Sequence, residues 1–425
     1  MIKREKTETI NLEYNLYDLP TAQHKAGLAG LLLMIESMKR RGITPLPSII
    51  EQTSTSVKME LTKEMMQAIF DDLYDGEWIE VESRTKWKNK NVEIPPKRTV
   101  EKEIKIGDKL KEQTYYIYNK VQPKGKFLQV LYSDADGLWI KLWRDMIWNT
   151  LRGKPLTRLV YEERANGNCS KLSSIYDDLK QSIESKKKSK IMVENLSGAL
   201  YLGAESESAE RTNFQGAKEN NFLLHFWPLS IAIFVPYAYD RKGKAERKGY
   251  VIVIPEPMNL ITFVEDTLNL FGSLVSTSFG IYPKKAIISL PAEGGLEYLC
   301  QIIKKEYTSA DIKHSISAIE IYHLEKIGNN IKMHSTEKII PNKKLIHKYI
   351  YISEHFYNPF YRSHCIKNIL SGKEWFEGMT TLFDLYPSEF FVKGDSTPSN
   401  LFFFGSDVRN NIKKIEERIK SQKEG

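Results

Sequence analysis

The sequence has few cysteines and no long uninterrupted apolar run. Its three cysteines, Cys169, Cys300 and Cys365, lie far apart and form no CxxC pair, so we expect a reducing compartment and no structural zinc site. The longest apolar stretch, residues 222–239, contains a histidine and two prolines and falls short of the roughly 20 clean residues of a membrane span. The charged N-terminus leads into no apolar segment of the signal-peptide type. These absences predict a soluble cytoplasmic protein.

Motifs of the common catalytic classes are also missing. The sequence contains no GxxxxGK[ST] phosphate loop, no GxGxxG after a strand, and no HExxH or GxSxG. His355, His364 and Cys365 fit no standard metal-site spacing. Glu103 and Lys105 match the ExK half of many nucleases, but in a chain with 27% charged residues this tripeptide is expected by chance. We therefore predict a non-enzymatic binding protein without cofactors, and keep a metal-dependent nuclease that uses scattered acids such as Glu103 as an alternative.

Positive charge is concentrated in one segment. The chain carries 62 Lys and Arg and 54 Asp and Glu, which gives a formal net charge of +8. Residues 84–126 contain 13 basic and 5 acidic residues, an excess equal to that of the whole chain. A local excess of this kind is expected of a surface that docks a polyanion such as nucleic acid. Two shorter basic runs follow at 186–190 and 241–248. The simpler interpretation of any one run is a solvated loop.

Aromatic and amide residues accompany the main basic segment. Trp87 lies between two lysines, and Tyr115, Tyr116 and Tyr118 follow the run. Stacking faces beside phosphate-binding ammonium groups are components of nucleic-acid sites, although tyrosines in strands are more often core residues. Asparagine side chains can contact base edges. The predicted nucleic-acid-binding residues of the three runs are Arg84, Lys86, Trp87, Lys88, Asn89, Lys90, Asn91, Lys97, Arg98, Lys102, Lys120, Lys124, Lys126, Lys186, Lys187, Lys188, Arg241, Lys242, Lys244, Arg247 and Lys248.

The hydrophobic pattern of the first part of the chain predicts a small α/β unit. A buried helix is expected over 21–41, with Asp18 and Thr21 as candidate N-cap residues, and its glycines allow another backbone to approach closely. The predicted elements that follow are a strand at 56–61, a helix at 63–74, a strand at 77–83, and a return into strand at 115–123 and 127–132. The basic segment is therefore expected to be a long excursion between strands, and neither a helix nor a strand is expected to absorb its first part, residues 84–100, easily.

The whole chain is predicted to have an α+β fold with mixed sheets, packed helices and two or more domains. Further predicted elements are helices at 137–153 and 169–190, an irregular stretch at 205–220, β-rich runs at 222–239 and 249–257 joined by a basic tip, a helix from Asn259 to 275, a strand at 285–291, a hairpin at 317–339, and helices at 343–355 and 407–422. The expected domains are an α/β domain at 1–155 with the basic insertion 84–126, a connecting region at 156–220, a β-rich α+β domain at 221–405 and a C-terminal helix at 406–425.

Two stretches carry a family resemblance. Residues 15–42, "NLYDLPTAQHKAGLAGLLLMIESMKRRG", and 225–257, "HFWPLSIAIFVPYAYDRKGKAERKGYVIVIPEP", resemble the large subunit of type I-B CRISPR interference complexes. The closest resemblance is to the Cas-eight family of the Cmx (myxobacterial) subtype. It extends from about residue 10 to about residue 400 and lies in the order of whole stretches. No catalytic motif carries it, and no residue-level signature identifies which side chains read DNA.

The resemblance implies a non-catalytic subunit of the Cascade complex. Such a subunit sits beside the 5′ handle of the guide RNA (crRNA), recognises the protospacer-adjacent motif (PAM) in double-stranded DNA, aids strand separation and R-loop formation, and recruits the helicase–nuclease, while RNA–DNA pairing reads the sequence. The implied partners are the crRNA, the target duplex, the backbone and 5′-handle subunits, the small subunit and the helicase–nuclease, with no membrane.

One departure from the family is expected at the C-terminus. Family members usually continue into a C-terminal helical bundle, which we expect here to be absent or supplied by another polypeptide. A scaffold protein whose basic loops bind acidic partners is a further alternative.

Overall fold

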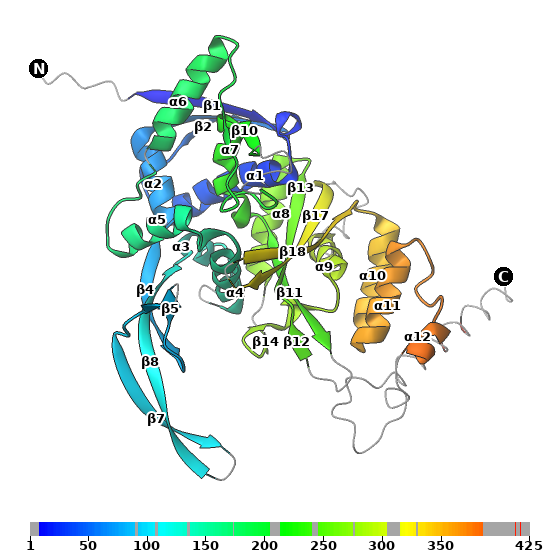
Figure 1. Ribbon diagram of the computed structural model, residues 1–425. Coiled ribbons are helices and arrows are strands. Elements are labelled where there is room, and N and C mark those ends of the chain that lie inside the picture. The colour runs from blue at the N-terminus through cyan, green and yellow to red at the C-terminus, as the bar shows by residue number, and fades with distance from the viewer. Residues whose placement is uncertain are drawn as a thin grey trace, which may run out of the picture.

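The computed structural model describes residues 8–89, 92–106, 109–133, 137–172, 174–204, 213–239, 245–274, 277–303, 315–328 and 330–385, with residues 413 and 417. Within these residues the chain forms several separate sheets with helices packed against them (Figure 1). The predicted α+β fold class is confirmed. None of the described helices is both long enough and apolar enough to cross a membrane.

The N-terminal part combines a small sheet with a buried helix. Strand β3 (Ser56–Thr62) pairs antiparallel with both β1 (Thr9–Asn15) and β2 (Ser48–Gln52). Helix α1 (Ala22–Arg40) begins after Thr21, whose side chain caps it, and is buried on nearly all sides. A Cβ added to either of its glycines would collide with a backbone carbonyl of the 222–229 turns, so the predicted close backbone approach is confirmed.

A strand–helix–strand unit leads into the basic segment. Helix α2 (Lys63–Leu73) buries its apolar stripe, and β4 (Gly76–Ser83) follows it, as predicted. The basic segment itself is mostly strand: a small hairpin of β5 (Lys88–Asn89) and β6 (Val92–Glu93), then the long β7 (Arg98–Ile106) and β8 (Lys109–Pro123). The stretch 84–100, which was expected to suit neither a helix nor a strand, contains β5, β6 and the start of β7, because polar side chains can occupy both faces of a projecting ribbon.

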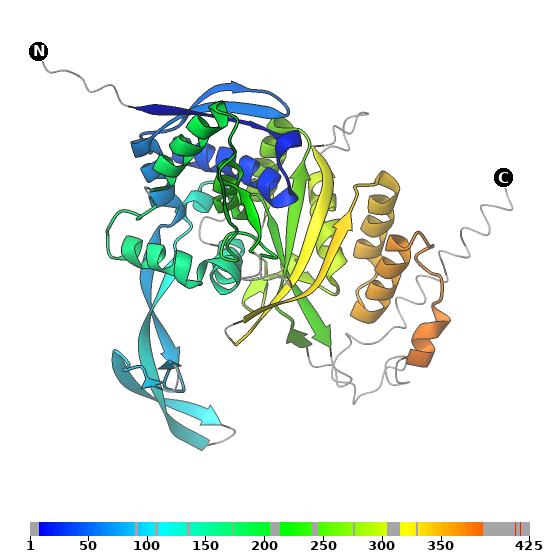
Figure 2. The same cartoon turned by 45° about the horizontal axis from the view of Figure 1, so that its top comes forward.

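We call residues 84–123 the arm. The strands of its sheet run in the order β4–β8–β7, and the arm projects from the body in both views (Figures 1 and 2). The chain leaves it at Gly125, whose φ of 62° places it in the left-handed region, and enters helix α3 (Lys126–Gln129). The strand predicted at 127–132 was therefore wrong, since this positive-φ turn redirects the chain into a helix.

A six-stranded sheet forms the centre of the molecule. Its strands are β12 (Ala245–Arg247), β11 (Ala232–Tyr239), β13 (Tyr250–Pro257), β17 (Ile316–Ile327) and β18 (Asn330–Ile339), with β16 (Ile287–Ile288) parallel to β11. The pairing of β11 with β13 and the β17–β18 hairpin are as predicted. Residues 222–229 are turns of 3-10 helix where strand was expected, with Pro228 in the second turn, and the strand predicted at 285–291 is reduced to β16.

Helices surround this sheet and the arm's base. They are α4 (Leu138–Ile147) with a π-helical turn at Trp148–Arg152, α5 (Pro155–Ala165), α6 (Ser174–Lys187), α7 (Lys218–Asn221), α8 (Leu260–Ser273), α9 (Pro291–Ile303), α10 (Lys343–His355), α11 (Pro359–Leu370) and α12 (Thr380–Leu385). The predicted helices at 137–153, 169–190, 259–275 and 343–355 are confirmed, whereas α9 and α11 were not predicted.

Short strands complete the described elements. They are β9 (Val193–Asn195) paired with β10 (Gln215–Ala217), and β14 (Ser278–Phe279) paired with β15 (Tyr282–Pro283). The irregular stretch predicted at 205–220 was partly wrong, because β10 and α7 lie in it, while 205–212 lie outside the described residues. The helix predicted at 407–422 lies outside them too, apart from 413 and 417.

One connected hydrophobic core runs through these elements. Helix α1 packs against both β13 and the turns at 222–229, and it therefore lies across the domain boundary expected near residue 220. The expected domain boundaries stay predictions.

Candidate nucleic-acid interface

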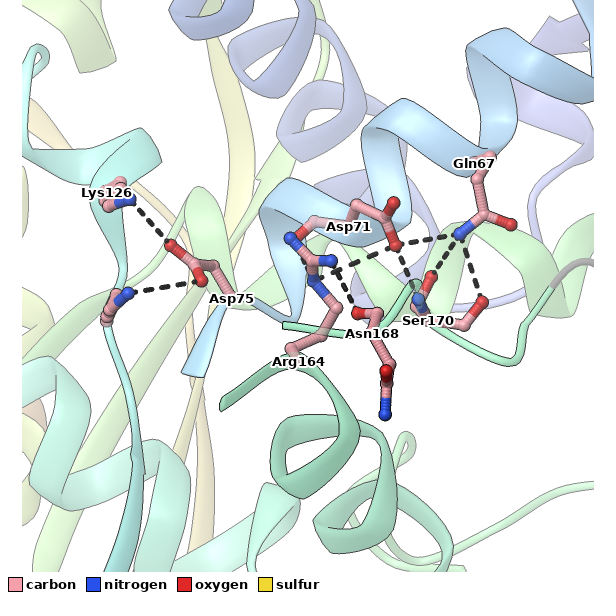
Figure 3. Close-up of polar contacts among 8 residues, drawn as sticks. Gln67, Asp71, Asp75, Lys126, Arg164, Asn168 and Ser170 are labelled. Atoms are coloured by element: carbon pink, nitrogen blue, oxygen red, sulfur yellow. Dashed lines mark hydrogen bonds and ion pairs between the residues drawn. The ribbon is translucent and has the colours of Figure 1, made fainter. Parts of the chain in front are cut away.

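The base of the arm is fixed by carboxylates of α2 and the turn after it (Figure 3). Asp75 accepts ion pairs from Lys124 at 3.6 Å and Lys126 at 3.2 Å, and its carbonyl accepts a hydrogen bond from the backbone N–H of Lys124 at 2.9 Å. Two of the predicted nucleic-acid ligands thus brace the arm, although the Lys126 side chain remains 51% exposed.

A second carboxylate fixes α2 to the chain that follows α5. Asp71 accepts a hydrogen bond from the backbone N–H of Ser170 at 2.6 Å and another from Gln67 at 2.8 Å. The Arg164 guanidinium lies 3.8 Å from Asp71 and donates to the carbonyl of Asn168 at 2.7 Å (Figure 3). This network ties α2, which precedes the arm, to α5 and to the loop that follows α5.

The register of β7 and β8 sorts the arm's side chains onto two faces. Directly opposed residues share a face and alternate residues change face, and the register pairs Arg98 with Ile117 and Lys102 with Gln113. The cationic face comprises Arg98, Val100, Lys102, Ile104, Lys111, Gln113, Tyr115 and Ile117. The acidic face comprises Thr99, Glu101, Glu103, Lys105, Leu110, Glu112, Thr114, Tyr116 and Tyr118.

Strand β4 contributes two carboxylates to the cationic face. Glu80 binds Lys97 at 3.0 Å and Arg98 at 2.5 Å, and Glu82 binds Lys102 at 2.5 Å. The hydrogen bond from Lys97, with the charge of Arg98, lowers the pKa of Glu80. All five side chains are more than one-third exposed, so these pairs add little to stability and their cations remain accessible to phosphate.

Trp87 is engaged within the arm. Its ring stacks on Tyr118 with centroids 4.3 Å apart and planes 5° apart, and its backbone N–H donates to the Tyr118 hydroxyl at 3.0 Å. The neighbouring Lys86 binds Glu93 at 2.9 Å, a hydrogen bond that raises the pKa of Lys86. One ring face of Trp87 is therefore occupied by Tyr118, and the predicted stacking of Trp87 on a base stays a prediction.

The remaining arm residues of the prediction differ in accessibility. Arg84 lies 6.0 Å from the ring of Tyr115, beside Lys102 at 5.5 Å. Lys88 is exposed. Lys120 is half-buried, and this burial lowers its pKa. The side chain of Asn89, and the residues Lys90 and Asn91, lie outside the described parts.

In the two shorter basic runs, the described residues Lys186 and Lys248 pair with carboxylates outside the arm. Lys186 binds Glu219 at 3.0 Å, and Lys187 and Lys188 are exposed near the end of α6, at the far end of the molecule from β7 (Figure 1). Lys248 binds Glu246 at 2.8 Å. The predicted ligands Arg241, Lys242 and Lys244 lie outside the described residues.

Arg247 has internal partners. Its guanidinium lies 4.1 Å from the ring of Tyr250 and 5.0 Å from that of Tyr282, and it forms an ion pair with Asp145 at 3.5 Å. These contacts give Arg247 a structural role in joining β12 to α4. Its predicted contact with nucleic acid stays a prediction.

Sequence reasoning missed Lys111, which is exposed on the cationic face. The signal that could have found it is the period of two in residues 109–117, which identifies a strand. The nuclease alternative gains no support in the part of the chain that the structure describes. There, Glu103 lies opposite Glu112 on the acidic face, and no group of three His, Cys, Asp or Glu side chains is placed to hold a metal ion.

Comparison with protein families decides the family. A model of the type I-B CRISPR Cas8b N-terminal domain matches residues 46–311, and a model of the Cas8b C-terminal domain matches residues 316–424. The chain belongs to the Cas8b family. The resemblance to the large subunit of type I-B CRISPR systems is thereby confirmed. No curated protein matches the chain.

The two Cas8b regions share one sheet. Strand β13 belongs to the N-terminal match and β17 to the C-terminal match, and they pair antiparallel along their lengths. The arm lies wholly within the Cas8b N-terminal match.

Proposed function

We propose that this Cas8b-family chain, within a Cascade complex of the Cmx subtype, recognises the PAM in double-stranded DNA. In this role it aids strand separation and R-loop formation and recruits the helicase–nuclease, without catalysing a reaction itself. Its partners are the crRNA, the target duplex, the backbone and 5′-handle subunits and the small subunit. The observation that carries the proposal is the arm, a braced ribbon that projects from the body with exposed cations.

The physical basis is electrostatic. Ammonium and guanidinium groups on a projecting ribbon can reach a duplex before the body does, and each phosphate they neutralise releases counterions. Since the rest of the chain is close to neutral by composition, the arm is the part of the molecule best suited to attract DNA first. Guide RNA pairing then supplies most of the sequence specificity.

Charge reversal in the arm tests the proposal. In the assembled complex, Lys97→Glu, Arg98→Glu and Lys102→Glu together should abolish capture of a PAM-bearing duplex in a gel shift, while size-exclusion chromatography shows intact assembly. The matched control is Lys343→Glu, Lys344→Glu and Lys367→Glu, which makes the same change in net charge at exposed positions of α10 and α11 and should bind DNA normally.

Normal capture by the arm variant would contradict the proposal. Indifference of the unaltered complex to nucleic acid would favour the scaffold alternative. Cleavage of DNA by the purified chain with Mg²⁺ or Mn²⁺, lost in Glu103→Gln, would favour the nuclease alternative.

A further inference from the structure

We propose that the arm contacts duplex DNA through its cationic face, with the acidic face turned away from the DNA. This inference rests on the proposed function and specifies which side of the arm carries it. It also assigns a DNA contact to Lys111, which the sequence-based set of candidates does not contain.

The first support is the distribution of charge between the faces. Among the described side chains of β7 and β8 from 98 to 117, the cationic face carries Arg98, Lys102 and Lys111 and no carboxylate, whereas the acidic face carries Glu101, Glu103 and Glu112 and one lysine. Glu103 and Glu112 are directly opposed, a destabilising arrangement of like charges. The acidic face would repel a phosphate backbone, and the cationic face would attract it.

The second support is the cover over the acidic side. Trp87 stacks on Tyr118 of that face, and Lys86 lies 5.9 Å from the ring of Tyr116. The residues that lead into the β5–β6 hairpin therefore pack over the tyrosines of the acidic face. On the cationic face, Tyr115 is flanked by two cations, Arg84 and Lys102, so an aromatic surface and positive charge coincide there.

The third support concerns the far end of the arm. The carboxylates of Glu80 and Glu82 on β4 reach across β8 to offset Arg98 and Lys102 on β7, and β4 ends opposite Tyr116. Beyond that point the arm is two-stranded, and Lys111 lies on the cationic face next to the cross-strand neighbours Lys102 and Gln113. The positive charge of the cationic face is therefore offset least by carboxylates at the end of the arm that lies farthest from β4.

The shape of the two-stranded part favours duplex DNA as the occupant. The seven residues of β7 beyond the end of β4, 100–106, span roughly 23 Å at about 3.3 Å per residue. The major groove of B-form DNA admits a two-stranded ribbon, and lysine and glutamine are side chains that read base edges there. The corresponding groove of A-form RNA is deep and too narrow for side chains to read.

A matched pair of lysine variants tests the inference in the assembled complex. Lys111→Gln and Lys105→Gln remove the same charge from exposed positions on neighbouring strands and opposite faces. With a PAM-bearing 40-bp duplex, we expect Lys111→Gln to weaken binding about fivefold and to reduce the slope of log K against log salt by about 0.9. Lys105→Gln should change neither quantity measurably.

A matched pair of glutamate variants tests it by gain of affinity. Glu82→Gln removes a negative charge from the cationic face and frees Lys102, so we expect about threefold tighter binding of the same duplex. Glu103→Gln removes the same charge from the acidic face and should leave the affinity unchanged.

The outcomes separate this inference from the proposed function. Equal effects of the two lysine variants, or of the two glutamate variants, would overturn the sidedness while leaving DNA binding by the arm intact. Normal binding by these variants and by the arm charge-reversal variant would overturn both. An equal loss of affinity by Lys111→Gln for a 40-bp RNA duplex would overturn the assignment to duplex DNA.

Discussion

Three buried polar residues of the body, Arg152, Tyr74 and His225, form a chain of hydrogen bonds. Arg152, which is 2% exposed, donates to the Tyr74 hydroxyl and, at 2.7 Å, to the carbonyl of His225. The Tyr74 hydroxyl also shares a hydrogen bond of 2.7 Å with Nδ1 of His225. Burial, and then the charge of Arg152, hold the pKa of His225 well below its ordinary value of 6.5.

This arrangement predicts a pH dependence of stability at the residue scale. Below about pH 6.5 the unfolded chain binds a proton at His225 and the folded chain does not, so stability present above that pH is lost as the pH falls. Between pH 7.5 and 5.5, we expect His225→Gln to lose about 1 kcal/mol less free energy of unfolding than the unaltered chain. Urea unfolding at the two pH values measures this.

His24 serves as the internal reference for that experiment. Burial lowers its pKa to about 4, and its titration is present in both chains and cancels in the comparison. An identical decline of the free energy of unfolding in the two chains would contradict the assigned state of His225.

At the scale of elements, helices with apolar stripes and caps were predictable and the arm was not. Helices α1 and α2 show both signals, and the β17–β18 hairpin shows alternation around a turn. In the arm the alternation is partly between charges of opposite sign, as in residues 101–105, so a hydropathy pattern does not reveal it. The pairing of basic residues with Glu80, Glu82 and Asp75 also depends on register and tertiary contacts, which a local pattern does not contain.

A buried ion pair joins the two Cas8b regions at this scale. Arg362 of α11 binds Glu293 of α9 at 2.5 Å, and Glu293 is 1% exposed. Arg362 also donates to the Tyr349 hydroxyl at 3.2 Å. Glu293 lies in the N-terminal match and Arg362 in the C-terminal match. The pair therefore joins α11 to α9, which packs against the central sheet.

Removing one partner of this pair should destabilise the chain. We expect Arg362→Met to cost about 3 kcal/mol because it leaves the Glu293 carboxylate buried without its cation. The double variant Arg362→Met with Glu293→Met should recover a large part of that loss, since no uncompensated charge remains. Thermal unfolding of the three chains measures this, and an Arg362→Met chain as stable as the unaltered one would refute the proposed fastening.

At the scale of the whole molecule, the described residues share one connected hydrophobic core, and the arm projects from it. The central sheet takes strands from both Cas8b regions, and Asp75 braces the arm's base through Lys124 and Lys126. The arm projects from this body (Figure 2). The fold class and the family could be predicted from the sequence, whereas the sidedness of the arm required the register of β7 with β8.

Photocrosslinking from the arm tests most directly whether the arm holds duplex DNA. A photoreactive amino acid would replace Gln113 on the cationic face, and a second complex would carry it in place of Lys344, exposed on α10. We predict that, in the assembled complex with a PAM-bearing duplex, position 113 crosslinks to DNA and position 344 does not. DNA crosslinks from position 344 with none from position 113 would contradict DNA binding by the arm.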